Sequence, residues 1–133
     1  MNDRVLFIRH HCSRSEQRLM RALRVLGQQH SDAASLSNER LEISMAERCS
    51  LLLMIRRAYA DKPEFELLGP NSPCVSRDEL RLLATLRHFG MEHDAAQADD
   101  STAPLMQRLF RENGRTVQRA GFALRSRPDV GRM

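Results

Sequence analysis

The chain has 133 residues, of which 41% are hydrophobic and 29% are charged. These values lie near the averages of globular proteins, so the sequence predicts one folded domain and excludes a wholly disordered or collagen-like chain. The formal net charge is +4, and arginine supplies 20 of the 21 basic residues. Because this preference for arginine over lysine is typical of a GC-rich genome, we expect a bacterial source.

Charge is distributed unevenly along the chain. Residues 1–30 carry a net charge of +4, residues 61–100 carry −5, and residues 101–133 carry +5. Basic ends of this kind can contact an anionic partner, or they can contact the acidic middle of the same chain. The sequence leaves both alternatives open.

Cysteine content and hydropathy indicate the cellular compartment in which the protein is expected. Cys12, Cys49 and Cys74 are odd in number and widely spaced, which argues against a disulfide framework and favours a reducing environment. The longest apolar run, residues 51–55, is far shorter than the roughly 20 residues that a transmembrane helix needs. The first residues contain no apolar stretch long enough for a signal peptide. We therefore expect a cytoplasmic protein that does not contact a membrane.

Two capping boxes are the strongest local signals. In the Ser-x-x-Glu motif the serine caps the start of a helix and the glutamate reaches back to the serine N–H. Residues 13–16 and 76–79 both have this motif, and leucines follow each one at helical spacing. The boxes predict helices over residues 14–26 and 77–89, each ended by the glycine that follows.

The stretch over residues 39–60 is ambiguous. Leu41, Ile43 and Met45 alternate as in a strand, whereas the hydrophobic residues that follow them have helical spacing. An apolar-rich stretch of this length without Gly or Pro is longer than a typical strand. We therefore predict a helix over 39–60, with a short strand at its start as the alternative.

The last third of the chain predicts a linker and two further helices. Residues 91–101 contain four acids and no base, which indicates a flexible acidic linker. A fourth helix is expected to start near Ser101 or Thr102 and to end at the turn-forming pair Asn113-Gly114.

The fifth helix is expected over residues 116–125, followed by a disordered basic tail over 126–133. The predicted fold is therefore all-α, a compact bundle of four to five short helices in a single domain over residues 1–125. The pattern also allows one short extended segment at the N-terminus.

The N-terminal segment resembles one enzyme family. Residues 5–11, Val-Leu-Phe-Ile-Arg-His-His, are similar to the opening strand of the histidine phosphatase (phosphoglycerate mutase-like) superfamily, which ends in Arg-His-Gly. The resemblance implies that His10 accepts a phosphoryl group and that Arg9 neutralises its oxygens. The chain departs from the family at His11, where the family has glycine. The second catalytic histidine of the family has only His93 as a candidate, and His93 follows a helix rather than a strand.

Other catalytic or metal-binding patterns are absent from the sequence. Zinc sites usually contain paired clips such as Cys-x-x-Cys, and this chain has none. We therefore predict no metal, no cofactor and no catalytic residues. Whether His10, Cys12 and Cys74 approach one another is a question for the tertiary structure.

Two segments resemble parts of bacterial helix-turn-helix domains. Residues 75–86 look like the first helix of such a domain, and residues 114–120 are similar to a recognition helix. About 12 residues separate the first of these helices from the next one, where such a domain has a turn of 3–4 residues. The resemblance implies base contacts from Thr116, Gln118 and Arg119. It implies phosphate contacts from Arg108, Arg111, Arg115 and Arg125.

The sequence thus predicts a small non-enzymatic helical protein with a regulatory role, and nucleic-acid binding by residues 101–133 is the most specific interpretation. A protein-interaction module that binds an acidic protein surface without contacting nucleic acid is the first alternative. Phosphotransfer of the histidine phosphatase type is the second. The sequence does not determine the oligomeric state.

Overall fold

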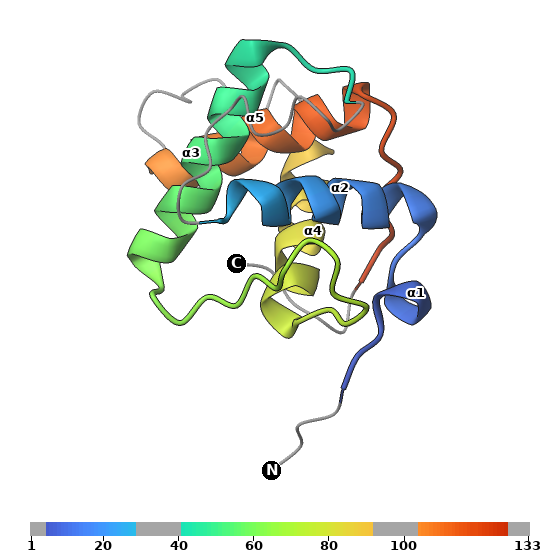
Figure 1. Cartoon of the computed structure of the whole chain (residues 1–133). Coiled ribbons are helices and arrows are strands. Elements are labelled where there is room, and N and C mark those ends of the chain that lie inside the picture. Colours follow the sequence, from blue (N-terminus) through green and yellow to red (C-terminus); the bar gives the residue numbers. More distant parts are fainter. Residues whose placement is uncertain (1–4, 29–40, 92–103, 128–133) are drawn as a thin grey trace.

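The computed structural model describes residues 5–28, 41–91 and 104–127. Over these ranges the chain forms five helices and no named strand, which confirms the all-α prediction. The α5 helix packs against both α3 and α4, and α2 packs against α3 (Figure 1). The helices are α1 (Ile8–His11), α2 (Arg14–Leu26), α3 (Met45–Asp61), α4 (Arg77–Gly90) and α5 (Leu105–Arg119).

The predicted helices over 14–26 and 77–89 are confirmed as α2 and α4. Both capping boxes form as expected, with Ser13 and Ser76 as the N-cap residues. The apolar faces of α2, α3 and α4 meet in one core, where each fully buried leucine contributes about 1.5–3 kcal/mol relative to exposure. The largest fully buried hydrophobic side chains are Leu19, Met20, Leu23, Leu26, Leu51, Met54, Ile55, Leu82, Leu83 and Leu86.

The α3 helix begins at Met45, later than the predicted start at residue 39. A third capping box causes this start, because Ser44 Oγ accepts from the Glu47 N–H at 3.1 Å and the Ser44 N–H donates to Glu47 Oε1 at 2.7 Å. Residues 41–44 are irregular, so the alternative of a short strand there is wrong. Residues 39 and 40 lie outside the described residues.

The predicted helix end at Asn113-Gly114 is wrong, because α5 continues through both residues. Each of them makes a contact that depends on its residue type. Asn113 is fully buried, and its Nδ2 donates to the Leu109 carbonyl within α5 and to the Ser50 carbonyl of α3. The Asn-Gly pair therefore links α5 to its neighbours instead of ending the helix.

Gly114 lies where α5 crosses the end of α4. A Cβ atom on Gly114 would lie 2.4 Å from the Leu86 carbonyl oxygen and 2.7 Å from the Gly90 nitrogen. A Cβ atom on Gly90 would likewise lie 2.7 Å from the Gly114 carbonyl. The two backbones approach this closely because both residues lack side chains.

The separate helix predicted over 116–125 is also wrong. Residues up to Arg119 belong to α5, and Ala120 is its C-cap. Gly121 then adopts a φ of +96°, which reverses the chain, and residues 122–127 run back towards α2 without helical structure. This segment, called the return segment below, carries the buried Phe122.

The N-terminal segment is extended, as predicted. Residues 5–7 are extended and form a single antiparallel bridge between Phe7 and Cys74, in agreement with the expected short extended segment. Apart from Met91, the predicted linker over 91–101 lies outside the described residues, as do residues 128–133 of the predicted tail.

The Gly114 contact predicts a specific loss of stability. Gly114→Ala is expected to lower the free energy of unfolding by about 1–3 kcal/mol, because backbone atoms of α4 must move to admit the methyl group. Urea denaturation followed by circular dichroism measures this change.

Gly69→Ala is the matched control, since nothing lies within 4 Å of a Cβ at Gly69 and its φ is not positive. Its unfolding free energy should be unchanged or raised by up to about 1 kcal/mol. A Gly114→Ala protein as stable as Gly69→Ala would contradict the close approach of α4 and α5.

Candidate functional site

Several arginines of this basic protein are engaged in holding the fold together. Arg24 is 2% exposed and forms a two-pronged ion pair with the fully buried Glu79, with N···O distances of 2.7 and 2.8 Å. Its remaining N–H groups donate to three carbonyls of the loop that precedes α4, so that all five guanidinium donors have acceptors. These carbonyls belong to Gly69, Ser72 and Cys74.

The carboxylate oxygens of Glu79 also have hydrogen-bond donors. Its Oε1 accepts from the Ser76 N–H as part of the capping box, and its Oε2 accepts from the Leu68 N–H. Together with the two contacts from Arg24, the carboxylate therefore has four donors. A buried ion pair stabilises a fold only when its other hydrogen-bonding positions are filled, and this pair meets that condition.

The return segment is held by a second buried pair. Arg127 donates through both Nη atoms to Glu16, the glutamate of the first capping box, and also to the His11 carbonyl. The Arg125 N–H donates to the same carboxylate at 2.9 Å. Arg127, which we expected in a disordered tail, is thus tied to the start of α2.

A third pair joins Arg119 at the end of α5 to Glu47 in the first turn of α3. Arg119 is one of the residues for which the helix-turn-helix resemblance implies a base contact. In this structure its guanidinium bridges two helices of the same molecule.

The other predicted nucleic-acid residues differ in how far they are exposed. Thr116 is only 6% exposed, so its side chain is not accessible to a base, and Gln118 is half-buried. Arg111 is 7% exposed, and its guanidinium lies over the Phe89 ring. Arg108 and Arg125 are exposed, and Arg115 is half-buried.

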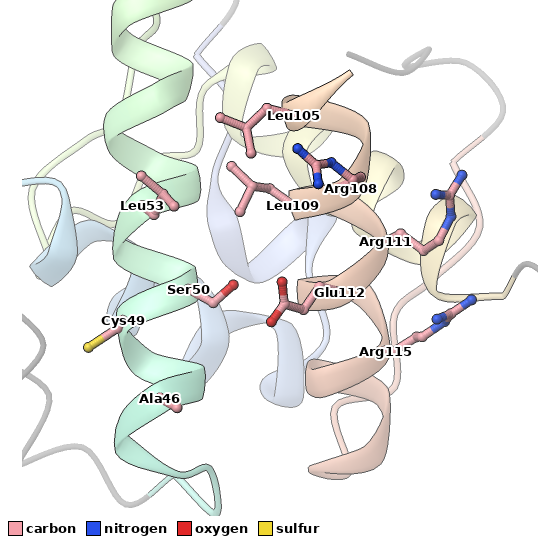
Figure 2. Close-up of a pocket in the computed structure, with 10 residues that line it drawn as sticks. All are labelled: Ala46, Cys49, Ser50, Leu53, Leu105, Arg108, Leu109, Arg111, Glu112 and Arg115. Atoms are coloured by element: carbon pink, nitrogen blue, oxygen red, sulfur yellow. The ribbon is translucent and has the colours of Figure 1, made fainter. Parts of the chain in front are cut away.

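A groove of about 770 Å³ lies along α3 and α5. In Figure 2, Leu105 and Leu109 extend from α5 towards α3, while Arg111 and Arg115 lie on the outer side of α5. The residues that line the groove are Ala46, Cys49, Ser50, Leu53, Leu105, Arg108, Leu109, Arg111, Glu112 and Arg115.

The floor of this groove is apolar at two exposed positions. Leu53 of α3 is 47% exposed and Leu105 of α5 is 39% exposed, and both line the groove. Exposed apolar surface beside polar residues marks interaction sites on soluble proteins. No local sequence pattern indicates this site, because Leu53 and Leu105 are brought together only by the packing of α3 on α5.

Polar groups occupy the middle of the groove. Ser50 and Glu112 point towards each other across it in Figure 2. The Ser50 hydroxyl is buried and has no hydrogen-bond partner within the described part of the chain, and the same holds for Asn113 Oδ1. Buried polar atoms of this kind are uncommon in folded proteins and are often completed by a ligand or by water.

The residues of the phosphatase resemblance lie elsewhere. Arg9 and His10 are exposed on the four-residue α1 helix, where Arg9 Nε donates to His10 Nε2 and the guanidinium lies over Phe7. The described ranges contain no parallel sheet of the kind that the resemblance implies. His93 lies outside the described residues.

The described residues contain no group of three or more His, Cys, Asp or Glu side chains that could hold a metal ion. His10, Cys12 and Cys74 therefore do not form such a group. Cys12 is buried, and this burial raises the pKa of its thiol to about 11, so the thiol is protonated at neutral pH.

Neither family models nor curated proteins nor solved structures show a match to this chain. Among the helices of the described ranges, none combines the length and the hydrophobicity that a bilayer crossing requires. The site must therefore be interpreted from its own geometry.

The Arg24 pair predicts a large effect from a single substitution. Arg24→Ala is expected to lower the free energy of unfolding by about 3–5 kcal/mol, because it leaves the Glu79 charge buried without its partner. Arg57→Ala breaks the exposed pair with Asp61 and should cost less than about 0.5 kcal/mol. Equal losses in the two variants, measured by urea denaturation, would contradict a structural role for Arg24.

The environment of the Glu16 carboxylate makes the free energy of unfolding depend on pH. Burial alone would raise the pKa of Glu16, but hydrogen bonds from Arg127 and from the N–H groups of Arg125 and Ser13 lower it below its usual value. Because the folded protein then holds this proton less tightly than the unfolded chain, stability is lost as the pH falls below about 4.3.

Glu16→Gln should therefore lose less stability than the wild type between pH 6 and pH 3. The exposed Glu64 is the control position, and Glu64→Gln should follow the wild-type profile. Unfolding free energies at four or five pH values test this, and parallel profiles for all three proteins would refute it.

Proposed function

We propose that this protein is a helical interaction module that binds an acidic, amphipathic segment of a partner protein in the groove between α3 and α5. The observation that carries the proposal is that exposed Leu53 and Leu105 lie in the groove together with the exposed Arg108. An amphipathic helix can place its apolar face on such a floor and an acidic side chain beside Arg108.

The charges of the groove agree with an acidic occupant. Arg108, Arg111 and Arg115 line it together with a single carboxylate, Glu112. Arg108 is the exposed arginine of this set and lies beside Leu105 and Leu109, whereas Arg111 and Arg115 lie on the outer side of α5 (Figure 2). The leucines therefore form the apolar side of the groove, and Arg108 forms its basic edge. This arrangement sets the orientation of a bound amphipathic segment around its own axis.

Nucleic-acid binding is the second candidate function, and the exposed Arg108 beside Arg111 and Arg115 supports it. Phosphate contacts need only such an edge of positive charge. Specific base contacts find less support, because Thr116 is buried and Arg119 is paired with Glu47. Exposed leucines also have no role in phosphate contacts.

A displayed library of 16-residue peptides tests the proposal, because selection finds ligands even when the partner protein is unidentified. We expect selection on the wild-type protein to enrich peptides with apolar residues at helical spacing and with acidic residues on one side. Leu53→Asp should weaken the selected peptides at least about tenfold, because it places a charge on the apolar floor. Val5→Asp, at an exposed apolar position outside the groove, should have no effect.

A salt titration separates the two functions. The same proteins are titrated with a labelled random DNA duplex at about 50 and 200 mM salt, where phosphate contacts give a steep loss of affinity. DNA binding that is weakened by Arg108→Gln but unchanged in Leu53→Asp, with no peptide enriched, would replace the interaction module by a nucleic-acid-binding protein. Enriched peptides that bind Leu53→Asp as tightly as the wild type would also overturn the proposal.

A further inference from the structure

A second pocket, of about 410 Å³, lies between α2 and the loop over residues 69–73. It is separate from the groove and shares no lining residue with it. Four of its lining residues are arginines of α2 and none is acidic. The lining residues are Ile8, Arg14, Gln17, Arg18, Arg21, Arg24, Pro70, Asn71 and Ser72.

Helical spacing brings these arginines to one side of α2. Positions 14, 18, 21 and 24 are separated by four, three and three residues, so their side chains lie on one face of the helix. Arg24 has a structural role, since its ion pair with Glu79 and its bonds to loop carbonyls hold the loop against α2. The pocket thus has a wall whose position is set by buried interactions.

Two of the other arginines are also held in place. Arg21 Nη1 donates to Asn71 Oδ1 of the loop. The Arg18 guanidinium lies over the Phe122 ring of the return segment, 5.4 Å from its centroid. A guanidinium that is already oriented loses less conformational entropy when it binds a ligand. The contact of Arg21 favours binding of an anion in the pocket, because its partner Asn71 also lines the pocket.

The loop supplies a further donor. The Cys74 N–H donates to Ser72 Oγ at 3.2 Å, so the hydroxyl oxygen is occupied as an acceptor and its own hydrogen can be given to a ligand. Ser72 and the arginines therefore present donors to the same space. A ligand that suits them must be rich in acceptor oxygens and negatively charged.

We propose that this pocket binds the diphosphate group of a small ligand. Guanidinium groups bind phosphate oxygens in a two-pronged manner, and one phosphate carries about −1.5 to −2 charge at pH 7. Two adjacent phosphates match the charge of Arg14, Arg18 and Arg21 better than one phosphate does. The volume of the pocket also admits more than a single phosphate group.

Isothermal titration of the 133-residue chain with inorganic pyrophosphate tests the proposal, with sulfate as the comparison ligand. We expect one saturable site for pyrophosphate and at least about tenfold weaker binding of sulfate. Arg21→Gln should weaken pyrophosphate about tenfold, because it removes a charged donor. Arg57→Gln, which removes the same charge from α3, should change the affinity less than about twofold.

Asn71→Ala is the more discriminating variant, because it changes no charge and removes only the group that orients Arg21. It should weaken pyrophosphate by about threefold or more while the melting temperature stays within a few degrees of wild type. A diffuse attraction between arginines and anions would leave the affinity unchanged in Asn71→Ala, and that result would contradict the proposal.

Titration with ADP shows whether the diphosphate belongs to a nucleotide. If ADP binds more tightly than pyrophosphate, the ligand is a nucleotide, and if the two bind equally the pocket recognises the diphosphate alone. Both results support the proposal. Equal affinities for pyrophosphate and sulfate, the same loss in Arg57→Gln as in Arg21→Gln, or no heat of binding at all would overturn it.

Discussion

The buried ion pair of Arg24 and Glu79 is the interaction on which the rest of the structure depends. It joins α2 to the start of α4 and fixes the loop that precedes α4 through three carbonyls. Two opposite charges in an apolar core are tolerated only when every donor and acceptor is used, which restricts the loop to one conformation. The pocket beside α2 is a direct consequence, because one of its walls is this loop.

The same arrangement occurs three times within the described part of the chain. Each capping-box glutamate accepts hydrogen bonds from its own helix and also binds an arginine from a distant segment, as Glu79 binds Arg24. In the other two pairs Glu16 binds Arg127 and Glu47 binds Arg119. A carboxylate in a first helical turn is already favoured by the helix dipole, so one residue stabilises both the helix and its tertiary contacts. These pairs also explain why several arginines of this basic protein serve the fold rather than a ligand.

The middle of α5 shows how tertiary contacts override a local signal. Asn-Gly favours a turn in an isolated chain, and glycine within a helix costs about 1 kcal/mol relative to alanine. In this protein Asn113 hydrogen-bonds to α3 while Gly114 admits the backbone of α4, so packing on both sides offsets the local cost. The unbroken helix extends α5 to Arg119, where the ion pair with Glu47 joins its end to the first turn of α3.

The sequence by itself determined the features that depend on neighbouring residues. The all-α class, the helices of α2 and α4 and the boxes that begin them follow from residues within three or four positions of one another. A third box, Ser44 to Glu47, was equally readable and shows that the start of α3 could have been predicted. Tertiary structure alone decided the continuity of α5, the partners of the capping glutamates, the groove and the pocket. Each of these features depends on contacts between residues that are far apart in the chain. The energies of such contacts cannot be inferred from a local sequence pattern.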